Sequence, residues 1–279
     1  MRDNQDRFGD LNSPDVTADV EQTNPTLSFV SPTEIVDLPS AGKYYPEGHC
    51  LCGKSSVEIK FMTAKEEDIL TNKSLIKKGV VIDRLLESIV VDKSVKIEDL
   101  LVGDKNALLL AARISGYGPD YSISVTCPIC QDKSQQTMNL EEVENKQLVE
   151  PEQRDVKMPS PGLFSVVLPK SKVEVVFRLL NGKDEAEITK KLISNKMSDS
   201  EANSTSQLKR LLVSANGVTD RQVLNEFSNN MPAIDARFLR NLVKDLSPDV
   251  DMMHDFSCSS CGHGEEVEIP FTVEFFWPK

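Results

Sequence analysis

The chain has 279 residues, of which 39% are hydrophobic and 27% are charged, and its formal net charge is −12 at pH 7. This length allows one large domain or two of ordinary size, each with its own core. The acidic balance argues against a general nucleic-acid binder, which needs a basic surface, and no apolar run reaches the roughly 18 residues of a membrane-spanning helix.

Residues 1–34 are predicted to form a disordered tail. They are rich in Asp, Asn, Gln, Thr and Pro and contain few apolar residues, so burial cannot compensate for the entropy lost on ordering. The first residues also lack the apolar core of a signal peptide. We therefore expect the protein to stay in a reducing cytoplasm, where paired cysteines bind metals more often than they form disulfides.

The first half of the chain is predicted to begin with an extended arm and to continue with strands and three helices. The arm, residues 35–48, contains two adjacent tyrosines that we expect to pack. Thr63 and Glu66 have the spacing of a capping box, which predicts a helix start, and Gly79 suits the helix end. The further elements expected here are one or two strands within 50–62, an amphipathic helix over 81–90, a buried helix over 105–114 capped by Asp104, and strands over 122–126 and 135–140.

An acidic linker over residues 141–153 is predicted to join the two halves. The second half then begins with a hairpin, continues with helices and ends in strands around its cysteines. These elements are expected at 164–168 and 173–179 for the hairpin, at 183–194, 207–215, 220–229 and 234–246 for the helices, and at 253–257 and 267–271 for the strands.

The two halves are predicted to be diverged copies of one unit. The segments that begin at Val57 and Val175 align without a gap 118 positions apart, and both lead from a strand into an acidic helix start. The cysteine pairs that follow lie 131 positions apart, so the second copy has gained residues between its strand and its cysteines. We expect the polar stretch 196–206 to hold some of them.

Four cysteines carry the main chemical signal. Cys127 and Cys130 form one Cys-x-x-Cys pair, Cys258 and Cys261 form another, and each pair lies between strand-like segments. Such a pair in a tight turn directs both sulfurs to one point, and two of these knuckles complete a tetrahedral zinc site. As many as 127 residues lie between the two pairs, so the duplication is needed to bring them together. We predict a structural Zn²⁺, because four thiolates leave no open position for catalysis.

Other interpretations of these residues stay open at this point. The four cysteines could be ordinary reduced thiols or the remnant of a lost site. His254 or His263, which flank the second pair, could replace a cysteine ligand. Cys50 and Cys52 lie beside His49, but their spacing does not suit a knuckle, and we expect buried thiols near the arm.

No reaction type has a candidate in the sequence. The acidic pairs Glu66–Glu67 and Asp184–Glu185 fall at predicted helix starts, where negative charge complements the helix dipole. The chain contains no Walker loop, no G-x-S-x-G elbow and no H-E-x-x-H motif. We therefore predict no enzymatic activity and no catalytic residue.

The C-terminal segment, residues 271–279, is unusually aromatic. It allows two interpretations. One is a closing strand that packs into the core. The other is a tail that presents its aromatic side chains to a partner.

Several short motifs follow one another in a specific order along the chain: Leu38–Pro46, Phe61–Asp68, Ser124–Cys130, Cys258–His263 and Phe275–Pro278. In this order they resemble the baseplate proteins of T-even-type contractile-tailed bacteriophages. The resemblance covers roughly residues 35–279. It implies a baseplate hub component or a hub-assembly factor without catalytic activity, whose partners are other phage baseplate or hub proteins.

The sequence as a whole thus predicts an α+β fold made of two diverged repeats that are joined by a zinc-ribbon-like pair of knuckles with four cysteines. The disordered tail is 1–34, the first repeat is 35–150, and the second repeat, with a helical insert and the aromatic tail, is 151–279. The protein would act in the host cytoplasm during assembly or in the virion tail baseplate. No membrane partner is expected because the chain has no long apolar run, and the acidic charge argues against nucleic acid as a partner.

Two rival functions come from other classes. The first is a zinc-ribbon factor for nucleic acid or transcription, with a local basic face at Lys73, Lys77, Lys78 and Arg84. The second is an enzyme with a catalytic zinc, which would need a three-ligand site that also holds water.

Overall fold

The structure, a computed structural model, describes residues 31–195, 201–269, 271 and 273–276. The predicted tail therefore lies almost entirely outside the described residues, as do residues 196–200 of the stretch 196–206. The described part has an α+β fold with eight α-helices and several small antiparallel sheets, as predicted. None of its helices is both long and apolar enough to cross a membrane.

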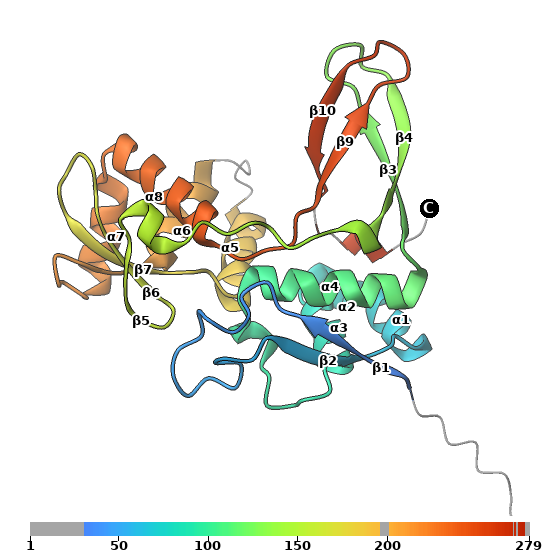
Figure 1. Cartoon of the computed structure of the whole chain (residues 1–279), viewed down its shortest axis with the longest axis horizontal. Coiled ribbons are helices and arrows are strands. Elements are labelled where there is room, and N and C mark those ends of the chain that lie inside the picture. Colours follow the sequence, from blue (N-terminus) through green and yellow to red (C-terminus); the bar gives the residue numbers. More distant parts are fainter. Residues whose placement is uncertain (1–30, 196–200, 270, 272, 277–279) are drawn as a thin grey trace, which may run out of the picture. The chain divides into compact units, whose positions relative to one another are not determined.

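The strands of the described residues form four sheets (Figure 1). Two pairs of strands carry the cysteines, one pair stands alone, and one sheet has four strands. The pairs are β1 (Thr33–Asp37) with β2 (Ser56–Lys60), β3 (Asp120–Thr126) with β4 (Lys133–Asn139), and β9 (Met253–Ser257) with β10 (Gly264–Glu268). The four-stranded sheet runs in the order β5 (Lys157–Ser160), β6 (Leu163–Val167), β7 (Glu174–Arg178), β8 (Leu212–Ala215).

The described helices are divided equally between the halves. The first half holds α1 (Ala64–Thr71), α2 (Lys73–Lys78), α3 (Val81–Ile89) and α4 (Val102–Tyr117), and the second holds α5 (Gly182–Asn195), α6 (Glu201–Leu211), α7 (Arg221–Asn230) and α8 (Ala233–Leu246). Short 3-10 helices lie at Ile97–Asp99, Leu140–Glu142, Pro151–Arg154 and Val273–Phe276.

The two halves repeat one arrangement of strands. In β1–β2 the first residue of one strand faces the last of the other, and β6–β7 has the same register: Thr33 faces Lys60, and Leu163 faces Arg178. In both halves a third segment joins the second strand of the pair, through Ile59–Val90 in the first and Phe177–Leu212 in the second. Each half then ends in a long helix followed by a cysteine-bearing hairpin.

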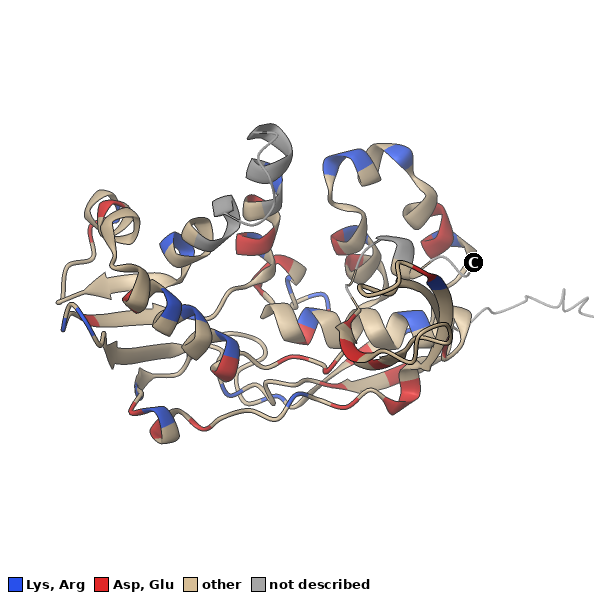
Figure 2. Cartoon of the chain, turned by 90° about the horizontal axis from the view of Figure 1, so that it is seen from above, with Lys and Arg blue, Asp and Glu red and all other residues tan. Residues whose placement is uncertain are grey.

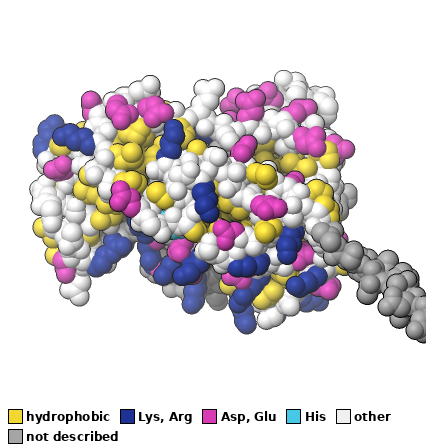
Figure 3. Space-filling view, turned by 60° about the horizontal axis from the view of Figure 1, so that its bottom comes forward, with side chains coloured by type: hydrophobic (Ala, Val, Ile, Leu, Met, Phe, Trp, Pro, Cys, Tyr) yellow, Lys and Arg dark blue, Asp and Glu magenta, His cyan; other side chains and the backbone are white. Residues whose placement is uncertain are grey.

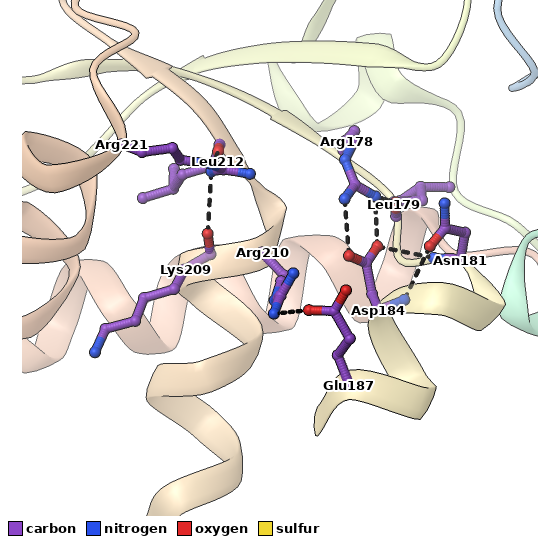
Figure 4. Close-up of polar contacts among 9 residues, drawn as sticks. All are labelled: Arg178, Leu179, Asn181, Asp184, Glu187, Lys209, Arg210, Leu212 and Arg221. Carbon is purple, nitrogen blue, oxygen red and sulfur yellow. Dashed lines mark hydrogen bonds and ion pairs between the residues drawn. The ribbon is translucent and has the colours of Figure 1, made fainter. Parts of the chain in front are cut away.

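Both halves also start a helix with the same cap. The backbone N–H of Thr63 donates to the Glu66 carboxylate at 3.0 Å, and the N–H of Asn181 donates to the Asp184 carboxylate at 3.2 Å. These pairs are 118 positions apart, as the sequence alignment requires. In the second half Arg178 also donates to both oxygens of Asp184, at 2.6 and 2.9 Å (Figure 4). A charge-assisted fork of this kind fixes the end of β7 against the start of α5.

A buried aspartate at the third position of the last helix is the other shared feature. Asp104 of α4 accepts hydrogen bonds from the backbone N–H and the hydroxyl of Ser40, at 2.9 and 2.6 Å, and from the Tyr45 hydroxyl at 2.7 Å. Asp235 of α8 accepts from the backbone N–H groups of Lys170 and Ser171, at 2.7 and 2.9 Å. Each carboxylate therefore joins the segment after the first strand of its half, β1 or β6, to the N-terminus of α4 or α8. Negative charge is favourable at a helix N-terminus.

Polar contacts connect the halves near these helix starts. Val102 N donates to Leu180 O at 3.3 Å, and Gly182 N donates to Leu100 O at 2.9 Å. The Lys105 side chain of α4 is 9% exposed, and its ammonium lies 2.9 Å from Asp83 and 3.0 Å from Glu185. One main hydrophobic core includes buried residues of both halves.

Several sequence predictions need correction here. The arm packs Tyr44 and Tyr45 as expected, but residues 33–37, which the prediction divided between the disordered tail and the arm, form strand β1. The first helix is interrupted at Asn72, whose side chain caps α2. Residues 212–215 form β8 instead of the end of a helix, because they complete the sheet beside β7. Asp104 lies inside α4, which begins at Val102, and so it is not the N-cap.

The C-terminal segment is packed, although not as a strand. Phe275 is 0% and Phe276 is 1% exposed, and both lie in a 3-10 helix. The buried guanidinium of Arg113 donates from Nε to Phe275 O at 3.0 Å and from Nη1 to Gly118 O at 2.7 Å. These two aromatic rings are therefore core residues, which contradicts their presentation to a partner.

Candidate metal centre

Each cysteine pair lies at the tip of a two-stranded hairpin, and the two tips have the same backbone geometry. Cys127 N donates to Asp132 O at 2.8 Å, and Gln131 N donates to Cys127 O at 3.0 Å. In the second tip Cys258 N donates to His263 O at 2.8 Å, and Gly262 N donates to Cys258 O at 2.9 Å. Gln131 and Gly262 both have positive φ, 61° and 73°. This left-handed residue turns the chain tightly enough to bring both cysteines of a pair to one side.

The two hairpins place four sulfurs in one cluster. Cys127 Sγ lies 3.6 Å from Cys261 Sγ, and Cys130 Sγ lies 3.6 Å from Cys258 Sγ. All four sulfurs lie within 4.8 Å of one another. Each close contact joins the first cysteine of one pair to the second of the other, so the contacts are equivalent under exchange of the halves.

These distances suit a tetrahedral tetrathiolate site. Sulfurs bound at about 2.3 Å to one Zn²⁺ are separated by about 3.8 Å in a regular tetrahedron. The first cysteine of each pair is buried and the second is exposed. A small apolar cluster around Cys127, Phe256 and Cys258, flanked by Val125 and Val267, supports the inner sulfurs.

The knuckle backbone also favours thiolates. The N–H of Cys261, helped by the N–H of Ser260 and by neighbouring thiols, lowers the pKa of Cys258 to about 7 in spite of its burial. The N–H of Asp132 favours the thiolate of Cys130, but desolvation by the neighbouring groups and the three other thiols outweigh it and raise the pKa of Cys130 to about 12. Four sulfurs this close repel one another when ionised, and a bound cation removes that repulsion.

Polar contacts between the hairpins were not anticipated from the sequence. The Ser260 hydroxyl donates to the Asp132 carboxylate, and the Gln136 side chain donates to Ser257 O at 3.3 Å. Both residue pairs are more than 120 positions apart. The only sequence signal was a polar residue beside each knuckle, which is too common to indicate a contact.

The remaining candidate ligands lie elsewhere or take other partners. Among the described residues, the group that could hold a metal consists of the four cysteines alone. His263 Nε2 lies 3.7 Å from a Glu265 carboxylate oxygen. His49 stacks on Tyr45 and accepts the N–H of Leu51. Cys52 is exposed, so the expectation that it is buried was wrong, while Cys50 is half-buried.

The T4 bacteriophage base plate protein family matches residues 32–277. The chain belongs to this family. Curated proteins and solved structures gave no match. Membership confirms the resemblance noted in the sequence, and it fits a structural role in the phage tail together with other baseplate proteins.

Proposed function

We propose that this baseplate-family protein is a non-enzymatic hub component or hub-assembly factor that acts by binding other phage baseplate or hub proteins. The observation that carries the proposal is the convergence of four sulfurs, two from each half, in a chain of this family. On this proposal the protein works in the host cytoplasm during assembly or stays in the tail baseplate.

In this proposal Cys127, Cys130, Cys258 and Cys261 hold one structural Zn²⁺. With four protein thiolates around the ion no position is left for water or substrate, so the metal would stabilise the fold rather than catalyse a reaction. Its ligands are 128 and 134 positions apart across the close contacts. An ion that joins them would lock the two hairpins together only once the chain has folded.

The domain division is part of the same proposal. Residues 35–150 would form the first repeat and residues 151–279 the second, after the segment 1–34. The matching hairpin registers, caps and buried aspartates support the two repeats, and β1, which begins at Thr33, extends the first repeat by two residues. The shared core indicates that the repeats fold as one unit.

A zinc-ribbon nucleic-acid factor is the second candidate. The observation that favours it is the set of exposed lysines on α2, with Lys73 at its start and Lys77 and Lys78 in its last turn. Arg84, the fourth residue of that face, is paired with Glu87 at 2.8 Å. Figure 2 shows basic and acidic positions intermixed over the ribbons, and the net charge is −12. Such a surface is a poor match to a phosphate backbone.

One preparation can test both candidates. Tagged protein is recovered from phage-infected cells, its partners are identified by mass spectrometry, and its zinc is counted by native mass spectrometry. Hub or baseplate proteins together with one zinc ion per chain are expected. Recovery of nucleic acid without tail proteins, lost as salt is raised, would support the second candidate instead.

A further inference from the structure

Strand β1 has an open edge in the described structure, whereas the equivalent strand of the second half does not. β6 is covered on that side by β5. The covered residue Ser165 is 7% exposed, and its equivalent Ile35, at the centre of β1, is 74% exposed. No other large hydrophobic residue of the described chain is so exposed.

The direction of the backbone groups identifies which residues face this edge. Phe61 N donates to Pro32 O at 2.9 Å, and Leu38 N donates to Ser55 O at 2.7 Å. Because bonded residues alternate along an antiparallel pair, the even-numbered residues of β1 bond β2, and residues 33, 35 and 37 direct their N–H and C=O groups outward. The equivalent residues of β6, Leu163 and Ser165, are the ones that pair with β5.

An edge of this kind is a template for another strand, and an apolar side chain at its centre adds to the attraction. Figure 3, which brings the lower side of Figure 1 forward, shows apolar groups between charged ones on the face to which β1 and β2 belong. We propose that a second copy of this chain pairs with β1 through its own β1, antiparallel and centred on Ile35.

The sequence of β1 is self-complementary in that register. Ile35 faces Ile35 of the second copy, and Thr33 faces Asp37, so that a hydroxyl meets a carboxylate. Glu34 faces Val36, and no two like charges are directly opposed. Lys60, the neighbour of Thr33 on β2, falls in the same row as Asp37 of the second copy.

The pairing makes a closed, twofold interface, because each copy offers the same strand. The two-stranded sheet β1–β2 becomes a four-stranded sheet across the axis. This matches the strand number that the second half reaches within one chain through β5 and β8. The two cysteine-bearing hairpins belong to other sheets and add no strand to this one.

Sedimentation of the zinc-loaded full-length protein over a range of concentrations tests the proposal. A monomer–dimer equilibrium is expected, and Ile35→Lys should weaken dimerisation at least tenfold because it places two ammonium groups opposite each other. Val167→Lys is the matched control, since Val167 is 55% exposed on β6, and it should leave the equilibrium unchanged. A dimer that survives Ile35→Lys overturns the proposal.

Amide hydrogen exchange of the unmodified protein distinguishes the other occupants of this edge. The N–H groups of Thr33, Ile35 and Asp37 should exchange more slowly as the protein concentration rises, while those of Glu34 and Val36 are protected throughout. Protection of all five that does not depend on concentration would show that the chain's own N-terminal residues cover β1. That result, or a monomer at every concentration, overturns the proposal.

Discussion

At the scale of single residues, the carboxylates of Asp104 and Asp235 occupy equivalent positions in the two halves but have different surroundings. Burial raises the pKa of Asp104, although hydrogen bonds from Ser40 and Tyr45 oppose the rise. Burial would also raise the pKa of Asp235, but the hydrogen bonds from Lys170 and Ser171 outweigh it and hold that pKa below its usual value. The second site offers two backbone N–H donors, which favour the ionised form.

The two aspartates should therefore give opposite pH dependences. Replacement by Asn at either position should lower the free energy of unfolding at neutral pH by about 1–3 kcal/mol, because buried hydrogen bonds are lost. The contribution of the Asp235 carboxylate to stability is present above the pKa of about 3.9 that Asp has in the unfolded chain. It is lost as the pH falls through the lowered pKa of Asp235 in the folded protein. The contribution of Asp104 is complete below that unfolded pKa and declines as the pH rises through the raised folded value.

Urea unfolding between about pH 3 and pH 7 measures this difference. The cost of Asp235→Asn should shrink toward acid, and the cost of Asp104→Asn should shrink toward neutral pH. Each variant is the other's control, because both remove a carboxylate from the same position of equivalent helices. Parallel curves for the two variants would contradict the assignment.

At the scale of elements, two short pieces of structure depend on contacts from distant segments. The C-terminal 3-10 helix is a short element that pairs with no sheet. It is held in place by the hydrogen bond from Arg113 and by aromatic contacts. Phe275 lies 5.0 Å from the Tyr121 ring and 5.2 Å from the Phe271 ring, centroid to centroid. Such pairs add to the free energy gained by burial.

Phe275→Ala should destabilise the protein by about 3–5 kcal/mol, because it leaves a large cavity among these rings. The melting temperature and the urea midpoint measure the loss. Ile129→Ala is the control, since Ile129 is 69% exposed and its removal should change stability by less than about 0.5 kcal/mol. Equal effects of the two substitutions would show that the Phe275 ring is not packed in the core.

The cysteine hairpins are the other dependent elements. Cys127→Ser should reduce the bound zinc and lower the melting temperature, and a chelator should then cause little further loss, because the ligand set is already broken. Cys52→Ser, at an exposed thiol outside the cluster, should keep the zinc content and the chelator response of the unmodified protein. Melting curves with and without chelator, with zinc counted on the same samples, decide this. A metal-free protein with unchanged melting would refute the zinc site.

At the scale of the whole molecule, one ammonium connects three helices of the two halves. Lys105 of α4 contacts Asp83 of α3 and Glu185 of α5. Its burial opposes the charge, but the carboxylates of Glu185 and Asp83 outweigh burial and raise its pKa. Removing it leaves two facing carboxylates without a cation between them.

Lys105→Met should therefore destabilise the protein by about 1–3 kcal/mol, because it removes hydrogen bonds to charged groups while keeping the apolar stem. Equilibrium unfolding in urea measures the change. The double substitution Lys105→Met with Glu185→Gln should recover part of the loss, since it removes one of the two carboxylates. If the double variant loses as much unfolding free energy as the two single variants together, the side chains of Lys105 and Glu185 are not coupled.

The sequence by itself determined the features whose cause is local. The capping box at Thr63, the end of α2 at Gly79 and the turn of each Cys-x-x-Cys pair depend on a few neighbouring residues, and so their positions could be predicted. The alignment at a spacing of 118 likewise anticipated that both halves lead from a strand into an acidic helix start. Only the tertiary structure decided the rest. β1, β8 and the buried C-terminal rings take their form from partners far along the chain, and the four sulfurs meet only because two hairpins fold against each other.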